Sequence, residues 1–341
     1  MNKFAFLIHP RDIEDLYRRF PLAKFLGKNL NHKIMKHLNG RLGFTVCSKF
    51  QIIHNQKKAE GYLIAVLLTA EQIMTLPSEF VRNRILKAVL YLQSLNVNVI
   101  GLGGLIKSVT HGGRWLVKKS EVIASITHGD TYSVVIAEEG VDKLIALKNL
   151  KNPFVAVVGA YGMIGSALSK ILSRKYRLLL VGKNQSKLFK LSKQIFPGLN
   201  CKISTNLSDI KEADLIVTVT NHPKSLLFPE HLKKNAVVYD VAQPMNLSSE
   251  VLQKRPDILR VDGCYVNIPN IDLRFDMGPP PGKTFACLAE TILQALEGEI
   301  GHHIGEIDLD YLEKMKEIGK KYNFNHADFT CFSKPIGYLN P

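Results

Sequence analysis

The strongest constraint on the fold of this chain is an apolar stretch that runs straight into three glycines spaced three residues apart. Residues 155–158 read Val-Ala-Val-Val, and the glycines open an apolar segment without proline. A turn this tight needs residues without Cβ, so that N–H groups at the start of a helix can approach a pyrophosphate. The pattern therefore predicts a strand, a turn and a helix that bind a dinucleotide. The residues expected to contact it are Gly159, Gly162, Met163, Ile164 and Gly165.

The end of the next strand favours NADPH over NADH. Residues 177–181 form an apolar run that ends at Gly182-Lys183-Asn184. An NAD site usually offers a carboxylate to the ribose 2′-hydroxyl at this point, and this chain has none there. A cation suits a 2′-phosphate, so Lys183 and Asn184 are expected to contact the cofactor. The alternative interpretation is that Lys183 is an ordinary solvated residue after a strand.

Three later apolar runs extend this unit into a sheet. They cover residues 214–220, 236–241 and 258–261, and each ends in polar or small residues. Strand ends lie at the cofactor edge of such a sheet, so Thr220 and Val241 are expected to line the nucleotide groove. The expected fold class is α/β, with a Rossmann-type doubly wound parallel sheet.

The residues before this unit predict a separate α/β substrate domain. Apolar runs indicate strands at 3–8, 43–47, 62–68, 97–102 and 122–127, and helical spacing indicates helices at 11–26, 81–95 and 131–147. A polar bridge at 148–153 marks the boundary. We expect a substrate domain at 1–150, a Rossmann NADP-binding domain at 151–276 and a C-terminal helical segment at 277–341, whose last helix covers 308–322.

Two junctions in the first domain resemble sites for a polar ligand. Gly103 and Gly104 follow one expected strand, and His128 and Thr131 flank the junction after another. Helix N-terminal N–H groups exposed there are candidate donors to an oxyanion. The alternative interpretation of His128 and Thr131 is a helix cap with a hydrogen-bonded histidine nearby.

Cys287 is the candidate nucleophile. Residues 277–282 contain three prolines, Thr284 is expected to cap a helix that ends at Gly298, and Cys287 would be its third residue. The positive end of a helix stabilises a thiolate, and Lys283 lies one turn earlier. A thiolate near a reduced nicotinamide suggests covalent thioester chemistry. The alternative is a core cysteine, because cysteine is among the most buried residue types.

The charge of the chain leaves two interpretations open. The net charge is +15, and residues 1–50 hold ten Lys and Arg against three Asp and Glu. This excess forms either a solvated surface or a docking face for an acidic partner. Zinc-ligand spacing and aromatic-basic interleaving are absent from the sequence, so we expect neither a metal site nor nucleic-acid binding.

Cysteine usage and hydropathy predict a cytoplasmic protein. The five cysteines are scattered and include no CxxC pair, which fits a reducing compartment. The first residues lack the pattern of a signal peptide. The longest apolar run, residues 62–70, is about half the length of a transmembrane span. Peripheral contact with a membrane stays open.

Four motifs together carry a family resemblance. They are Gly101-Leu-Gly-Gly104, Thr127-His-Gly-Asp-Thr131, Val155–Gly165 and Phe285-Ala-Cys-Leu-Ala-Glu290. In this order, over residues 60–325, the chain resembles the long-chain acyl-acyl carrier protein reductases of cyanobacteria and their wider bacterial relatives. The resemblance implies that Cys287 accepts an acyl chain as a thioester, and that NADPH reduces it to a fatty aldehyde. It also implies a cofactor role for Lys183, an apolar channel in the substrate domain, and acyl carrier protein or acyl-CoA as the acyl donor.

Some features differ from the cyanobacterial enzymes. The run at 278–282, the pair His302-His303 and the residues from Cys331 to Pro341 look more like the wider relatives, and His302-His303 has no assigned role. The apolar runs 62–70 and 85–100 are either channel wall or core.

Two rival functions remain. One is a shikimate-dehydrogenase-like enzyme that oxidises a small hydroxy or amino acid and uses Cys287 only structurally. The other is an interaction protein that senses NADP(H) through its Rossmann domain.

Overall fold

The computed structural model of the chain describes residues 2–10, 43–54, 56–195, 201–222, 224–242 and 244–336. Its contacts divide the chain into two interleaved units. Unit 1 comprises residues 1–129, 269–277 and 287–306, and unit 2 comprises 130–268, 278–286 and 307–341. The domain boundaries expected after residues 150 and 276 stay a prediction.

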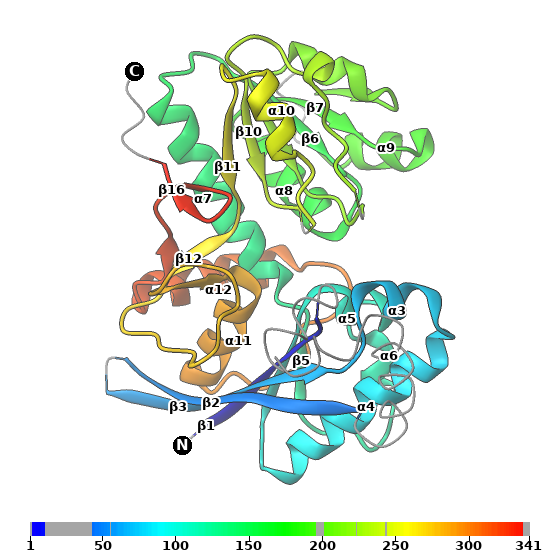
Figure 1. Cartoon of the computed structure of the whole chain (residues 1–341), viewed down its shortest axis with the longest axis vertical. Coiled ribbons are helices and arrows are strands. Elements are labelled where there is room, and N and C mark those ends of the chain that lie inside the picture. Colours follow the sequence, from blue (N-terminus) through cyan, green and yellow to red (C-terminus); the bar gives the residue numbers. More distant parts are fainter. Residues whose placement is uncertain are drawn as a thin grey trace, which may run out of the picture. The chain divides into compact units, whose positions relative to one another are not determined.

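Unit 1 is built on a mixed five-stranded sheet (Figure 1). Its strands are β1 (Asn2–Ile8), β2 (Phe44–His54), β3 (Lys57–Val66), β4 (Val99–Leu102) and β5 (Ser125–Thr127), in the order β2-β3-β1-β4-β5. Only the β2–β3 pair is antiparallel. All five expected strands are present. Strand β2 runs seven residues beyond the expected end at 47, because its alternating polar residues face solvent and break the apolar run. The helix expected at 11–26 lies outside the described residues.

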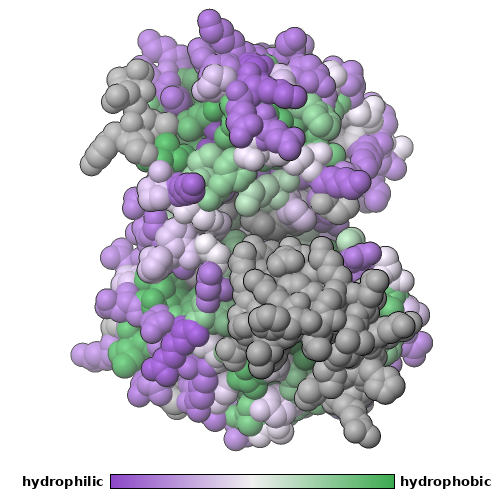
Figure 2. All heavy atoms as spheres, viewed as in Figure 1, coloured by the Kyte–Doolittle hydropathy of each residue, from purple (hydrophilic) through white to green (hydrophobic). Residues whose placement is uncertain are grey.

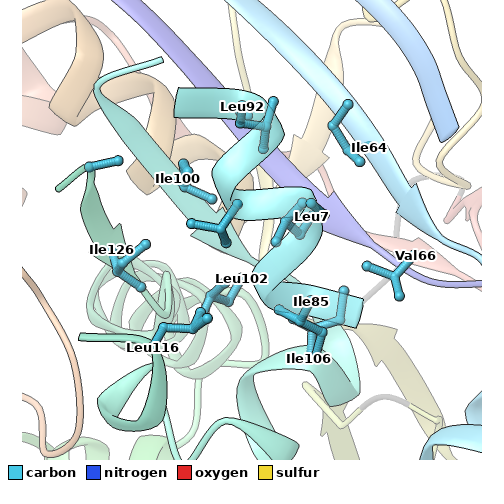
Figure 3. Close-up of a cluster of buried hydrophobic side chains, with 14 of the residues drawn as sticks. Leu7, Ile64, Val66, Ile85, Leu92, Ile100, Leu102, Ile106, Leu116 and Ile126 are labelled. Carbon is cyan, nitrogen blue, oxygen red and sulfur yellow. The ribbon is translucent and has the colours of Figure 1, made fainter. Parts of the chain in front are cut away.

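One face of this sheet packs against a long helix and forms the main core of unit 1. The helices are α3 (Ala70–Thr75), α4 (Ser78–Ser94), α5 (Gly104–Val109) and α6 (Arg114–Val117). Side chains such as Leu7, Ile64 and Ile100 from the sheet meet Ile85 and Leu92 from α4, and all five are fully buried (Figure 3). The apolar runs 62–70 and 85–100 therefore contribute to a packed core.

The opposite face of the sheet carries α11 (Ala286–Glu297). A Cβ at Gly101 in β4 would overlap the hydroxyl of Thr291, so the helix lies directly on the strand. The amide of Asn2 at the start of β1 donates to the carbonyl of Ala295 at 2.7 Å. Asn2 is the first described residue of β1, and Ala295 lies in the last turn of α11. The last turn of α11 therefore lies at the start of β1, and its first turn lies at the carboxyl ends of the parallel strands.

The start of α11 differs from the expectation. Thr284 lies in a short strand, β13 (Lys283–Phe285), and pairs with Val266 of β12 (Tyr265–Asn267). The helix begins at Ala286, so Thr284 does not cap it and Cys287 is its second residue. The expected end is confirmed, since Gly298 follows the helix with φ +72°.

Unit 2 contains the expected Rossmann sheet. Its six strands are β6 (Phe154–Val158), β7 (Arg177–Val181), β8 (Cys201–Ser204), β9 (Leu215–Thr218), β10 (Val237–Asp240) and β11 (Leu259–Asp262). All are parallel, in the order β11-β10-β9-β6-β7-β8. The glycine-rich turn follows β6, and the strand order reverses there, which is the doubly wound pattern. The fold class predicted from the sequence is confirmed.

Helices and short strands complete unit 2. The helices are α7 (Asp130–Leu147), α8 (Met163–Leu172), α9 (Gln185–Ser192), α10 (Ser249–Lys254) and α12 (Leu309–Lys321), with 3-10 turns at Leu207–Glu212 and Pro229–His231. Strand β14 (Asn325–His326) pairs with β12, and β15 (Thr330–Cys331) pairs with β16 (Lys334–Pro335). Helix α12 is confirmed, and Asp308 caps it as its acidic start suggests.

Where Figure 2 shows described residues, hydrophilic side chains cover most of the visible face. Among the helices that the structure describes, none combines the length and the apolar character needed to cross a bilayer.

Candidate functional site

The glycine-rich turn has the geometry that a pyrophosphate requires. Gly159 has φ +91°, and its N–H donates to the carbonyl of Val181 at 2.9 Å. Gly162 precedes the first residue of α8 without a side-chain cap. A Cβ at Gly165 would overlap the carbonyl oxygen of Gly159, so only glycine lets the helix approach the turn. The N–H groups of Met163 and Ile164 in the first turn of α8 are thus placed to bind an anion.

The end of β7 presents cations. Lys183 and Asn184 are exposed, and the Asn184 side chain caps α9 by accepting from the Lys187 N–H at 2.9 Å. The Lys187 ammonium lies 5.5 Å from the centre of the Tyr161 ring. A Cβ at Gly182 would lie 2.5 Å from the same ring, so Tyr161 covers the strand end. Lys187 is a second cation that the sequence interpretation missed, although its place one turn into an exposed helix is a readable signal.

Thr220 and Val241 follow the neighbouring strands β9 and β10. A Cβ at Gly159 would lie 3.0 Å from Thr220 Cγ2, so Thr220 borders the glycine-rich turn. Its hydroxyl donates to the Asn246 side chain at 2.8 Å. Val241 instead contacts Gly263, where a Cβ would lie 2.5 Å from Val241 Cγ2. A direct contact of these two residues with the cofactor stays a prediction.

In unit 1, Cys287 lies against the loop that follows β5. It is half-buried, and a Cβ at Gly129 would lie 2.5 Å from Cys287 Cβ and 2.6 Å from its Cα. Gly129 has φ +71°, a conformation that glycine adopts without strain. Position 287 in the first helical turn places the sulfur near the positive end of the α11 dipole. The sequence-based choice of Cys287 is consistent with this position.

A buried carboxylate lies one turn further along α11. Glu290 has no exposed surface, and its Oε1 accepts from the hydroxyl of Thr127 at 2.5 Å. The Thr127 hydroxyl oxygen in turn accepts from the Gly129 N–H at 3.1 Å. Thr127 and Glu290 lie inside the sequence motifs 127–131 and 285–290, and neither was a predicted site residue. A glutamate in the middle of an apolar helix was the available signal.

The structure brings most of the predicted oxyanion residues to one edge of the unit 1 sheet. Gly103 and Gly104 follow β4, and His128 follows β5. The Gly103 N–H donates to Leu7 at 2.8 Å, and the His128 N–H donates to His303 at 3.1 Å. These two N–H groups are therefore already engaged in main-chain hydrogen bonds, whereas an oxyanion role of the other groups stays a prediction.

Thr131 belongs to unit 2 and is the second residue of α7, so it is not the helix cap. His9, which the sequence analysis did not consider, accepts from the Leu105 N–H at 3.1 Å. His302 accepts from the Ile126 N–H at 3.2 Å through Nδ1, and His303 bridges to Thr127, so the pair extends the sheet beside β5. Among the described residues, no cluster of His, Cys, Asp and Glu has the arrangement of a metal site.

Comparisons with known proteins relate the chain to oxidoreductases. The family model for shikimate/quinate 5-dehydrogenase matches residues 142–263. A long-chain acyl-[acyl-carrier-protein] reductase from Synechococcus elongatus is 27% identical over 285 residues, covering 79% of this chain and 81% of the relative. The aminotransferase PigE of a Serratia strain is 23% identical over 350 residues, covering 94% of this chain. The chain spans only 39% of the length of PigE.

Two solved structures align with part of this chain at low sequence identity. L-tryptophan dehydrogenase from Nostoc punctiforme is 13% identical with a TM-score of 0.38, covering 76% of this chain and 69% of that one. A dipicolinate synthase chain from Bacillus halodurans is 12% identical with a TM-score of 0.34, covering 54% of this chain and 61% of that one. The Rossmann sheet, the glycine-rich turn and the sequence relatives together support an NAD(P)-dependent oxidoreductase.

Proposed function

We propose that this chain is an NADPH-dependent reductase that converts a fatty acyl thioester to a fatty aldehyde, with Cys287 as the nucleophile. The observation that carries the proposal is the position of Cys287 in the first turn of α11, at the carboxyl edge of the parallel strands of unit 1. Ligands of α/β sheets usually bind at this edge. The 27% identity to a long-chain acyl-[acyl-carrier-protein] reductase supports the same chemistry.

The proposed reaction needs no ATP, because a thioester is already activated. The Cys287 thiolate attacks the thioester carbon, a new C–S bond forms, and the bond to the carrier sulfur breaks. The carrier leaves as a thiol after taking up the proton that Cys287 released. NADPH, when bound, supplies the hydride that converts the acyl group to an aldehyde and frees the Cys287 sulfur.

The chain offers suitable groups to hold NADPH. The first N–H groups of α8 face the expected pyrophosphate position, with no Cβ at Gly162 to obstruct them. Lys183 and Lys187 are the candidate ligands of the 2′-phosphate, and Thr220 and Val241 are the candidate lining of the groove. Residues 143–208, which include both lysines, contain twelve Lys and Arg and no Asp or Glu. A charge of this sign favours the more negative of the two nicotinamide cofactors.

The proposed acyl donor is acyl carrier protein or coenzyme A. Both are anionic, and the net charge of +15 favours their encounter with this chain. The name of the Synechococcus relative points to the carrier protein.

Intact-mass measurement tests the proposal directly. The protein is incubated with palmitoyl-CoA or palmitoyl-acyl carrier protein without NADPH, and NADPH is added afterwards. We expect a mass gain of one acyl group that NADPH discharges as aldehyde. Cys287→Ala should prevent the gain, whereas Cys201→Ala, which alters another half-buried cysteine, should preserve it. An acyl adduct that persists in Cys287→Ala, or no adduct with acyl chains of any length, would contradict the proposal.

The match of residues 142–263 to the shikimate/quinate 5-dehydrogenase model favours a second candidate, a dehydrogenase of a small hydroxy or amino acid. In that case Cys287→Ala should keep most of the activity, because the hydride would pass directly between substrate and cofactor. Tight NADPH binding without turnover of thioesters or small substrates would instead favour a nucleotide-sensing protein.

A further inference from the structure

We propose that Thr127 and Glu290 are positioning residues, which hold the first turn of α11, and with it Cys287, through a closed ring of contacts that passes through Gly129. The proposal rests on the proposed function, in which Cys287 is the nucleophile. Every residue of this ring belongs to unit 1.

Gly129 packs directly against Cys287. A Cβ at Gly129 would lie within 2.6 Å of the Cβ, the Cα and the carbonyl oxygen of Cys287. The backbone of Gly129 therefore touches the main chain of the nucleophile, and not only its flexible end. A shift of the loop after β5 must move Cys287 or open a gap beside it.

The hydroxyl of Thr127 fixes the loop after β5. A threonine hydroxyl has one proton to donate and lone pairs to accept with. Its proton goes to Glu290 at 2.5 Å, and its oxygen accepts from the Gly129 N–H at 3.1 Å. Because the hydroxyl proton goes to Glu290 Oε1, the carboxyl group sets the direction of the hydroxyl and leaves its lone pairs for Gly129.

The backbone of α11 links Glu290 to Cys287 and so closes the ring. Glu290 and Cys287 are three residues apart on α11, and so lie on the same side of the helix. Thr291 adds a second tether, since its hydroxyl donates to the Cys287 carbonyl at 3.2 Å and stands over Gly101. The ring thus joins the nucleophile to β5 through one hydroxyl and one carboxylate.

The burial of Glu290 supports a role beyond packing. Its side chain is fully buried in a helix whose neighbours Leu288 and Ala289 are apolar. A hydrophobic residue of similar size usually serves stability as well as a buried ion does, so a buried carboxylate is better explained by the geometry it specifies. Here that geometry is the separation between the loop after β5 and the sulfur-bearing turn.

Paired substitutions separate positioning from folding. Thr127→Val removes the hydroxyl and keeps the shape, Thr127→Ser keeps the hydroxyl, and Glu290→Gln keeps an oxygen acceptor. The matched control is Thr330→Val, because Thr330 is a buried threonine in unit 2 that also donates to a carboxylate, that of Asp262 at 2.7 Å. Two rates are measured for each protein: formation of the Cys287 adduct from palmitoyl-CoA, and alkylation of the Cys287 peptide by iodoacetamide.

We expect Thr127→Val to slow adduct formation about ten- to a hundredfold, the usual effect of misplacing a reacting group by an ångström or less. The KM for palmitoyl-CoA should change much less, and alkylation of Cys287 should slow several-fold. Thr127→Ser and Glu290→Gln should keep at least about a third of the wild-type rates, and Thr330→Val should not alter them.

A folded Thr127→Val protein that reacts at the wild-type rate would overturn the proposal. So would a fall of both Thr127→Ser and Glu290→Gln well below about a third of the wild-type rates, a result that decides the matter even if Thr127→Val does not fold. If wild-type protein forms no adduct while Thr127→Val still slows alkylation, the proposed function fails and the positioning role stands. If adduct forms equally in wild-type and Thr127→Val, the positioning role alone fails.

Discussion

The free-energy cost of crowding between Gly129 and Cys287 can be separated from the cost of backbone strain, because unit 1 contains a second glycine with nearly the same φ. Gly129 has φ +71° and Gly298 has φ +72°, so alanine meets the same backbone strain at both, roughly 1–2 kcal/mol. The two sites differ in the space that is available to a Cβ. The nearest atom to a Cβ at Gly298 is Asn2 Nδ2 at 3.4 Å, an ordinary contact, whereas a Cβ at Gly129 would lie 2.5 Å from Cys287 Cβ. Forcing atoms into such an overlap costs about 1–3 kcal/mol more.

We therefore expect Gly298→Ala to lower the free energy of unfolding of unit 1 by about 1–2 kcal/mol, and Gly129→Ala by about 2–5 kcal/mol. Urea unfolding followed by tryptophan fluorescence measures this unit selectively. Trp115 is the single tryptophan of the chain, and it lies in unit 1 between Arg82 and Lys119, whose charged groups are 5.9 and 4.7 Å from its ring. With a urea slope of about 2 kcal/mol per molar, the Gly129→Ala midpoint should lie roughly 0.5–1.5 M below that of Gly298→Ala. Equal midpoints would refute the packing argument.

Three further predictions concern unit 2. Burial lowers the pKa of His326 to about 4 from its usual 6.5. The stability that the neutral ring contributes is therefore complete above pH 6.5 and is lost as the pH falls towards 4. The total loss in the free energy of unfolding should be about 3 kcal/mol. Urea titrations followed by circular dichroism between pH 7.5 and 4.5 should show this slope in wild-type and a weaker one in His326→Gln. Arg260→Met leaves the buried Asp240 and Asp262 without their shared cation, and should cost about 3–5 kcal/mol by the same assay, whereas Lys320→Met at the exposed Lys320–Glu317 pair should change little. Lys183→Glu should raise the Kd for NADPH at least about tenfold and leave that for NADH nearly unchanged; isothermal titration of both cofactors checks this, and equal losses for both would contradict the 2′-phosphate role.

The Rossmann unit was predictable because each of its signals is local. Within seven residues, Gly159 has φ +91°, a Cβ at Gly165 would lie 2.3 Å from the Gly159 carbonyl oxygen, and a Cβ at Gly162 would lie 3.1 Å from the same atom. The central strands are buried on both faces and so read as continuous apolar runs. Helix α12 likewise combines an apolar stripe with an acidic cap in one short segment.

The errors arose where pairing over long distances decides the structure. Thr284 has the chemistry of a helix cap, but its backbone pairs with Val266 in a strand of three residues. Such strands are too short to show a periodicity. The bond between Thr127 and Glu290 joins residues that are 163 positions apart, and nothing in either local pattern reveals it. Chemistry that depends on such pairs becomes visible only in three dimensions.

The placement of α11 on β1, β4 and β5 also bears on how the protein is synthesised. Thr127 leaves the ribosome 163 residues before Glu290, and at about 5–20 residues per second this interval lasts roughly 8–33 s. During that time the face of the sheet that contains Phe6 and Gly101 lacks α11, the described helix that packs on it, while all six strands of the Rossmann sheet emerge. Unit 1 thus completes its structure after the Rossmann sheet, and the part of the sheet face that α11 later covers is a natural target for chaperones in the growing polypeptide.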